Sequence, residues 1–379
     1  MRNNSRVKLV LGNGFDLFCG LKTKYIDFFK SEKRKYDEIK KWRNFFIGKE
    51  GNLDVYIKRS SFNWEKLWEQ LPNESECNIW DIYFALEIGE NDYKWCDIEA
   101  EMLKTFINHE KKFNWDTVFS IVCNRNYDDE LDHEILMAAY IIHKAPLILT
   151  WADFYVFLLQ ELNKFEKNFG EYVRNEYETN YEDKVLPNAK KIIDFFENKG
   201  LGKIVSTETF NYTDNNIKSE SNGISIFDTI HHINGNYNNP IFGIDSSKIK
   251  VESPIVFFTK VARRMQGLTQ INNDSFLTFG FDFDTLIIFG HSLNEHDYSY
   301  FFPIFDYLDM TNITKNTALV FAYYIYDEEK RNIILLDLTS RIIRIIDAYE
   351  SYAGVKKAHR LIDSLTAQGR IILKEIPNS

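Results

Sequence analysis

The feature that most constrains this fold is a short apolar run, residues 7–11, that ends in Gly12-Asn13-Gly14. A buried strand that ends in Gly-x-Gly and leads into a helix is typical of the first unit of a nucleotide-binding α/β fold. The first glycine allows a tight turn, and the second lets backbone N–H groups approach a phosphate at the start of the helix. Leu17 occupies the place of the third glycine of the full motif. The motif therefore predicts either a nucleotide site or a tight strand–helix turn.

The rest of the chain divides into a helical half and a half in which strands and helices alternate. Up to residue 199 the apolar spacing predicts helices over residues 25–42, 64–70, 78–86, 98–113, 129–143, 151–168 and 184–198. After residue 200 it predicts strands over residues 203–207, 224–226, 229–233, 285–290, 317–325 and 370–376. Helices over residues 254–265, 295–308, 331–349 and 355–367 are expected between these strands.

This alternation predicts an α/β, Rossmann-like fold with a mainly parallel open sheet. We expect a large helical insertion, residues 45–199, after the first strand–helix unit. The nucleotide-binding core would then comprise residues 1–44 and 200–379.

Composition and charge exclude several classes of protein. The 379 residues carry 46 Lys and Arg against 56 Asp and Glu, a net charge of −10, which argues against general nucleic-acid binding. The four cysteines are scattered without metal-ligand spacing, so we expect no metal and a reducing cytoplasm. No run approaches the roughly 20 apolar residues of a membrane helix, so we expect no membrane partner.

Polar residues gather after three of the predicted strands, in residues 12–16, 209–214 and 290–297. Loops at the carboxyl ends of parallel strands line one crevice, so we expect the three stretches to meet there. A fourth stretch, residues 229–236, would place His232 and Asn234 on one face if it is extended.

Each of these polar residues also has a structural interpretation. Asn211 could cap a turn, His232 could be a core histidine, and Asp297 could cap the following helix. His291 and His296 lie in one loop but lack a third metal ligand at a suitable spacing.

Four stretches together resemble the AbiH family of bacterial abortive-infection proteins. They are Gly12-Asn13-Gly14-Phe15-Asp16 with Gly20-Leu21-Lys22-Thr23, Trp95-Cys96-Asp97-Ile98-Glu99, Phe210-Asn211-Tyr212-Thr213, and residues 289–301 with their Gly-His-Ser-Leu motif. The resemblance implies a cytoplasmic phage-defence protein. It also implies a phage-derived trigger or a co-encoded defence protein as partner, and a homo-oligomer as one assembly.

The AbiH pattern is in turn similar to the sirtuin-like domains of other phage-defence proteins, which implies NAD as substrate or ligand. By position, Asn211 would be the catalytic asparagine. The residues implied to bind the dinucleotide are Gly12, Asn13, Gly14, Phe15, Asp16 and Thr23 at one end, and Gly290, His291, Ser292 and Asp297 around the ribose and adenine.

The chain departs from the sirtuin-like pattern at one position. The pattern's His-Gly pair reads Asn234-Gly235 here, and an asparagine cannot take a proton at neutral pH. The catalytic base would therefore be absent or supplied by His232.

Three functions remain open from the sequence. The first is hydrolysis of the N-glycosidic bond of NAD or a related nucleotide, and the second is a nucleotide-binding sensor or partner-binding module without hydrolysis. The third is a metal-dependent nuclease that uses Asp97 and Glu99 beside Trp95. For that last motif, a helix cap at Asp97 is the structural alternative.

Overall fold

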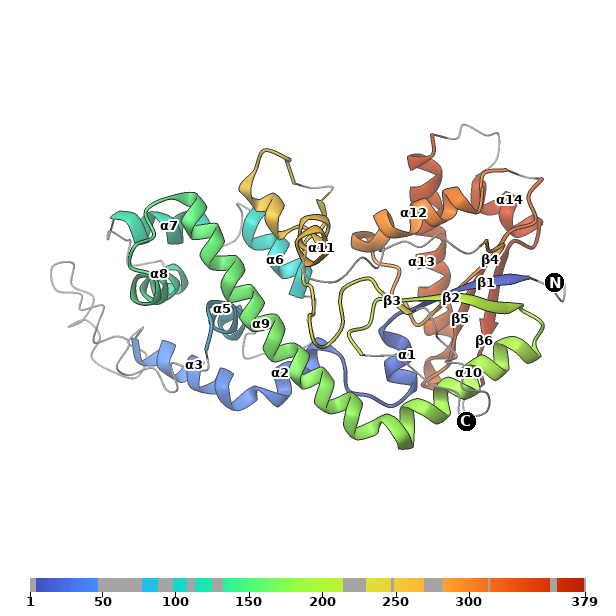
Figure 1. Cartoon of the computed structure of the whole chain (residues 1–379), viewed down its shortest axis with the longest axis horizontal. Helices are drawn as coiled ribbons and strands as arrows, with labels where there is room; N and C mark the ends of the chain where they lie inside the picture. The colour runs from blue at the N-terminus through green and yellow to red at the C-terminus, as the bar shows by residue number, and fades with distance from the viewer. Residues whose placement is uncertain are drawn as a thin grey trace. The chain divides into compact units, whose positions relative to one another are not determined.

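A computed structural model describes residues 5–46, 77–87, 98–107, 113–124, 132–213, 230–246, 249–268, 282–312, 314–354 and 360–377 (Figure 1). The chain forms two compact units. Unit 1 comprises Met1–Thr23, Val173–Pro240 and Leu268–Ser379, and unit 2 comprises Lys24–Tyr172 and Ile241–Gly267. The domain bounds expected from the sequence, with a break at residues 44 and 200, stay a prediction.

Unit 1 is built on an open, six-stranded parallel sheet. Its described strands follow the order β3-β2-β1-β4-β5-β6, and every neighbouring pair is parallel. The strands are β1 (Arg6–Leu11), β2 (Lys203–Thr209), β3 (Ile230–His232), β4 (Thr285–Phe289), β5 (Ala318–Tyr323) and β6 (Ile371–Glu375). The predicted α/β class with a mainly parallel open sheet is confirmed. The strand expected at residues 224–226 lies outside the described residues.

Helices cover both faces of this sheet. Leu9 and Leu11 of β1 face one side, where they join a core with α1 (Asn13–Phe18), the end of α9 (Trp151–Asn180) and α10 (Leu186–Asn198). Val10 faces the other side, where the core includes α12 (Tyr298–Tyr307), α13 (Arg331–Tyr352) and α14 (Leu361–Ala367). Because both faces are covered, residues 7–11 of β1 and 285–289 of β4 are apolar at nearly every position.

The register of the central strands brings three strand ends to one level. Leu11, the last residue of β1, pairs with Thr209 at the end of β2 and with Phe289 at the end of β4. In this strand order, β1 and β4 flank the point at which the chain changes direction across the sheet, which is where ligands bind in open α/β sheets. The loops after β1, β2 and β4 therefore start side by side.

Unit 2 consists of helices. They are α2 (Tyr25–Ser31), α3 (Lys33–Phe46), α5 (Ile79–Glu87), α6 (Ile98–Ile107), α7 (Trp115–Asn124), α8 (Asp132–Lys144), most of α9 and α11 (Lys260–Leu268), with a 3₁₀ turn over Pro254–Phe258. The helices predicted near residues 78–86 and 129–143 are confirmed, and the helix predicted over residues 98–113 is described over Ile98–Ile107. The structure adds α7, and the helix expected at residues 64–70 lies outside the described residues. None of the described helices combines the length and the apolar character that crossing a membrane requires.

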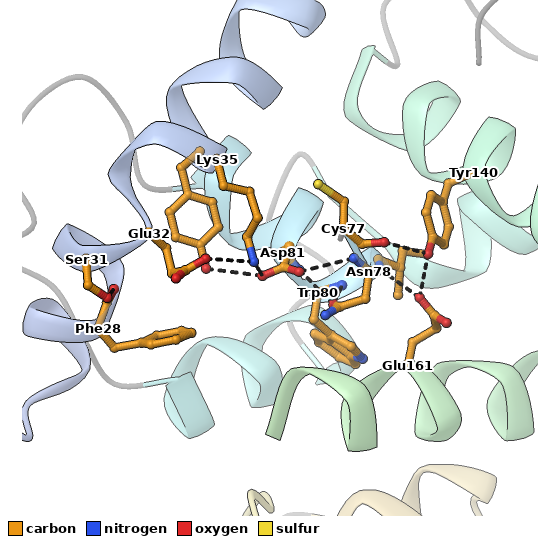
Figure 2. Close-up of polar contacts among 12 residues, drawn as sticks. Phe28, Ser31, Glu32, Lys35, Cys77, Asn78, Trp80, Asp81, Tyr140 and Glu161 are labelled. Atoms are coloured by element: carbon orange, nitrogen blue, oxygen red, sulfur yellow. Dashed lines mark hydrogen bonds and ion pairs between the residues drawn. The ribbon is translucent and has the colours of Figure 1, made fainter. Parts of the chain in front are cut away.

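A buried polar cluster closes the N-terminus of α5 (Figure 2). The Asn78 side chain accepts hydrogen bonds from the second and third helical N–H groups at 2.9 and 3.0 Å. Asp81 accepts in return from the Asn78 N–H at 3.1 Å and pairs with Lys35 at 3.0 Å. Glu161 accepts from the first helical N–H at 3.0 Å and from the Tyr140 hydroxyl at 2.7 Å. The first N–H groups of a helix have no partner within the helix itself. Here these side chains provide partners for them, in a helix whose described side chains are all buried.

Candidate functional site

Backbone hydrogen bonds tie together the three loops at the carboxyl end of the sheet. The Gly12 N–H donates to the Phe289 carbonyl at 2.9 Å, and the Gly14 N–H donates to the Gly290 carbonyl at 2.7 Å. On the other side of β1, the Phe210 N–H donates to the Leu11 carbonyl at 2.9 Å. The structure thus brings the loops together, although they are about 80 to 280 residues apart in the chain.

The two glycines of the first loop are required by close contact with the loop after β4. A Cβ atom on Gly12 would lie 2.4 Å from the His291 Cα, and one on Gly14 would lie 2.5 Å from the Gly290 Cα. From the sequence, these backbone N–H groups are predicted to bind a phosphate. In the structure both donate to protein carbonyls, so the missing side chains serve the approach of two backbones.

Asp16 is the polar centre of the site. Its side chain projects from α1, and the residue is 1% exposed. It accepts a hydrogen bond from Asn211 Nδ2 at 2.9 Å, and the Thr213 hydroxyl lies 3.0 and 3.2 Å from its two oxygens. Burial raises the pKa of Asp16 to about 7, against the lowering effect of hydrogen bonds from Thr213, Thr23 and Asn211. The carboxyl group therefore titrates near neutral pH.

Asn211 lies two residues after the end of β2, and its side-chain amide is hydrogen-bonded within the protein through Nδ2. Its backbone N–H donates to the Thr209 hydroxyl at 3.1 Å, and its Nδ2 donates to Asp16. Its Oδ1 atom is buried and has no hydrogen-bond partner within the described part of the chain. A buried amide oxygen without a partner is costly, so this atom marks a place for a ligand or a water molecule.

The other candidates from the first loop lie around Asp16. The Thr23 hydroxyl donates to Asn13 Oδ1 at 2.7 Å, which ties the two ends of the loop together. Phe15 is 1% exposed and packs edge-to-face on Phe289, with ring centres 6.4 Å apart. Phe15 thus belongs to the core beneath the loop.

Residues of β3 and the turn after it contact the loop after β2. His232 pairs with Thr209 in the sheet, and its Nδ1 lies 3.4 Å from the Asn211 carbonyl. Asn234 Nδ2 donates to the Phe210 carbonyl, also at 3.4 Å. Because a carbonyl oxygen only accepts, the His232 contact requires the proton on Nδ1 and leaves Nε2 as the basic nitrogen.

The loop after β4 is organised by His291. Its Nδ1 accepts a hydrogen bond from the Leu293 N–H at 2.9 Å, and its Nε2 lies 3.5 Å from Asp297 Oδ2. Its ring packs against Phe210, with centres 4.3 Å apart. Asp297 makes no side-chain cap to α12, although it precedes that helix. The Ser292 carbonyl accepts from the Arg341 guanidinium at 2.7 Å.

The remaining candidates belong to the Trp-x-Asp-x-Glu stretch. Trp95 and Asp97 lie outside the described residues. Glu99 lies on α6 of unit 2, where it forms an ion pair with Lys260 at 2.8 Å and accepts from the Gly243 N–H at 3.2 Å. Across the residues that the structure describes, no three His, Cys, Asp or Glu side chains are grouped as metal ligands.

Sequence reasoning did not single out Thr213 or Arg341. Thr213 lies two residues after Asn211 in the same motif, and this proximity could have identified it as a site residue. Arg341 lies on α13, far from any motif, and its contact with the loop after β4 depends on helix packing.

The chain matches a protein-family model. The family model described as "Bacteriophage abortive infection AbiH" matches residues 9–321, which include Asp16, Asn211 and the loop after β4. No curated protein and no solved structure matches the chain. The family match spans well over half of the 379 residues. The chain therefore belongs to the AbiH family of bacteriophage abortive-infection proteins.

Proposed function

We propose that this protein acts in abortive infection by binding NAD or a related nucleotide in the cytoplasm and hydrolysing its N-glycosidic bond. The ligand would lie at the carboxyl end of β1, β2 and β4, as in the sirtuin-like domains that the sequence resembles. The observation that carries the proposal is the buried Oδ1 of Asn211, which lacks a partner among the described residues at the point where open α/β sheets bind ligands.

The reaction needs little covalent participation from the protein. The bond between ribose C1′ and the nicotinamide nitrogen breaks, and its electron pair leaves with nicotinamide. A water oxygen bonds to C1′, and the water loses a proton, giving ADP-ribose. In this scheme Asn211 Oδ1 accepts a hydrogen bond from the ribose or from the attacking water and holds it in line.

We assign to His232 the role of accepting the proton of the attacking water. Its Nδ1 lies 3.4 Å from the Asn211 carbonyl, so the imidazole ring is close to the proposed site. A neutral imidazole can accept the proton of the attacking water as a general base.

A second function, nucleotide binding without hydrolysis, is favoured by one specific observation. Asn234, which occupies the position of the sirtuin-like histidine, uses its side-chain amide to bond the Phe210 carbonyl. The residue thus holds the loop after β2 and has no proton-accepting group. A phage-derived trigger or a co-encoded partner would then read out the bound nucleotide.

The test is incubation of the purified protein with NAD, with nicotinamide and ADP-ribose followed by chromatography. Asn211→Ala and His232→Ala should each lower turnover by about 100-fold or more. Asn124→Ala, on the exposed surface of α7, is the matched control and should leave turnover unchanged. The same assay is repeated with lysate from phage-infected cells, in case a trigger is needed.

The outcomes separate the two functions. Turnover that both site variants abolish supports the hydrolase. Saturable NAD binding with no turnover, even with infected lysate, supports the sensor. No NAD binding under either condition contradicts both.

A further inference from the structure

We infer that Asp16 is a positioning residue that fixes the orientation of the Asn211 amide, so that the ligand group facing Asn211 must be a hydrogen-bond donor. The identity of the ligand rests on the proposed nucleotide function, whereas the orientation rests on geometry alone.

The orientation follows from the chemistry of the two groups. A primary amide has a donor end and an acceptor end that are nearly equal in size. Above its pKa of about 7 the Asp16 side chain is a carboxylate, which only accepts. Asp16 lies 2.9 Å from Asn211 Nδ2, so the donor end is used inside the protein. Rotating the amide by half a turn would place Oδ1 against a carboxylate, with two acceptors in contact.

Asp16 is itself held in place. The Thr213 hydroxyl lies within hydrogen-bonding distance of both carboxyl oxygens, and the residue is almost completely buried. Neither the carboxyl group nor the amide can reorient without breaking these contacts. The acceptor Oδ1 of Asn211 is therefore the end that remains for a ligand.

This arrangement defines the chemical class of the ligand group. A hydroxyl group or a water molecule can donate to Oδ1, whereas a phosphate or carbonyl oxygen would meet it acceptor to acceptor. A buried site that offers only an acceptor discriminates strongly against groups that cannot donate. For a nucleotide, the donor is a ribose hydroxyl or the attacking water.

The decisive experiment exchanges the two side chains. Asn211→Leu keeps the approximate size and removes both polar ends, so nucleotide affinity or turnover should fall about tenfold or more. The double variant Asp16→Asn with Asn211→Asp puts the amide on α1 and a carboxylate at position 211. That carboxylate still presents an acceptor to the ligand, so the double variant should lose clearly less affinity or turnover than Asn211→Leu. Thermal unfolding confirms that each variant is folded.

Asn211→Asp alone gives a further signature. It places two carboxyl groups about 2.9 Å apart, and one of them must keep a proton. Its binding should therefore weaken as the pH rises, and the added Asp16→Asn change should remove that dependence. If the folded double variant loses as much nucleotide affinity or turnover as Asn211→Leu, the ligand needs the donor end of the Asn211 amide, and the inference is overturned.

Two further readouts locate the donor and separate this inference from the proposed function. A change in Kd points to a ribose hydroxyl, and a change in kcat alone points to the attacking water. Without ligand, the Nδ2 protons of Asn211 should exchange slowly with solvent in a ¹⁵N NMR spectrum. Rapid exchange overturns the inference whatever binds. Slow exchange together with no nucleotide binding contradicts the proposed function but supports the inferred orientation of the Asn211 amide.

Discussion

Lys8 on β1 and Glu208 on β2 form an ion pair of 2.5 Å in which both side chains are completely buried. The Lys8 ammonium also lies 5.2 Å from the centre of the Phe283 ring. The pair joins two central strands close to a register irregularity between Val7 and Lys8. These two strands lead into α1, which carries Asp16, and into the loop that carries Asn211.

Removing one partner of this pair should be more damaging than removing both. Lys8→Met leaves an unpaired buried carboxyl at Glu208 and should cost about 3–5 kcal/mol, whereas Lys8→Met with Glu208→Leu should recover most of that loss. Urea denaturation measures both. Burial already raises the pKa of Glu208, against the Lys8 charge that lowers it. The single variant should therefore lose stability further as the pH rises. Equal stability of the single and double variants would contradict this account.

The pKa of Asp16 predicts how stability depends on pH. A rise from 3.8 to about 7 on folding corresponds to about 4 kcal/mol. Because the folded-state pKa is the higher one, this contribution is complete below about pH 4 and is lost as the pH rises through about 7. Cys19, the other titratable group facing Asp16 within the described chain, has a pKa that burial holds well above its ordinary value, so it stays neutral.

The measurement is the thermal midpoint from pH 4 to pH 8 for the parent protein and Asp16→Asn. Glu166 in unit 2 also has a pKa raised to about 7 by burial, so the difference between the two proteins is the informative quantity. The parent should lose more stability than Asp16→Asn as the pH rises. Parallel curves would show that Asp16 is ionised throughout.

Gly14→Ala should destabilise unit 1 because its Cβ would overlap the backbone at Gly290. Overpacking of this kind costs about 1–3 kcal/mol. Gly369→Asn is the comparison, because nothing lies within 4 Å of a Cβ there and asparagine tolerates its positive φ of 65°. Chemical denaturation of both variants measures the difference. A phosphate-binding role without a packing role would instead leave the stability of Gly14→Ala unchanged.

His291→Asn and His291→Gln should differ. Asparagine can place an acceptor near the position of Nδ1, where His291 accepts from the Leu293 N–H, and glutamine places its amide near Nε2. We expect His291→Gln to be less stable than His291→Asn by about 1 kcal/mol, the net value of one hydrogen bond. The reverse order in thermal unfolding would show that the contact of Nε2 with Asp297 matters more.

Asp81→Ala should destabilise unit 2, because Asp81 accepts a hydrogen bond from the N–H of the capping residue Asn78 and pairs with Lys35 (Figure 2). Loss of this reciprocal capping bond and of the buried acceptor should cost about 2 kcal/mol. Glu38→Ala removes an exposed i,i+4 partner of Arg34 and should cost less than about 0.5 kcal/mol. Circular dichroism during urea titration compares the two, and similar losses would refute the capping role.

Local patterns predicted much of this protein. Residues 7–11 and 285–289 are apolar at nearly every position because both faces of their strands are covered, and that is visible without a structure. The glycine turn and the polar stretches after the strands also follow from sequence, since loops at strand ends need glycine and polar side chains. The family resemblance drawn from these stretches agrees with the matching family model.

The tertiary structure decided what those residues do. Asp16 and Asn211 are 195 residues apart, and they meet only because Leu11 pairs with Thr209 in the sheet. The same register brings the Asn211 side-chain amide within hydrogen-bonding distance of Asp16. Sequence patterns indicate which segments are buried, because buried faces require apolar residues at a regular spacing along the chain. Hydrogen-bond partners depend on strand register and helix packing, which are set by contacts across the whole chain.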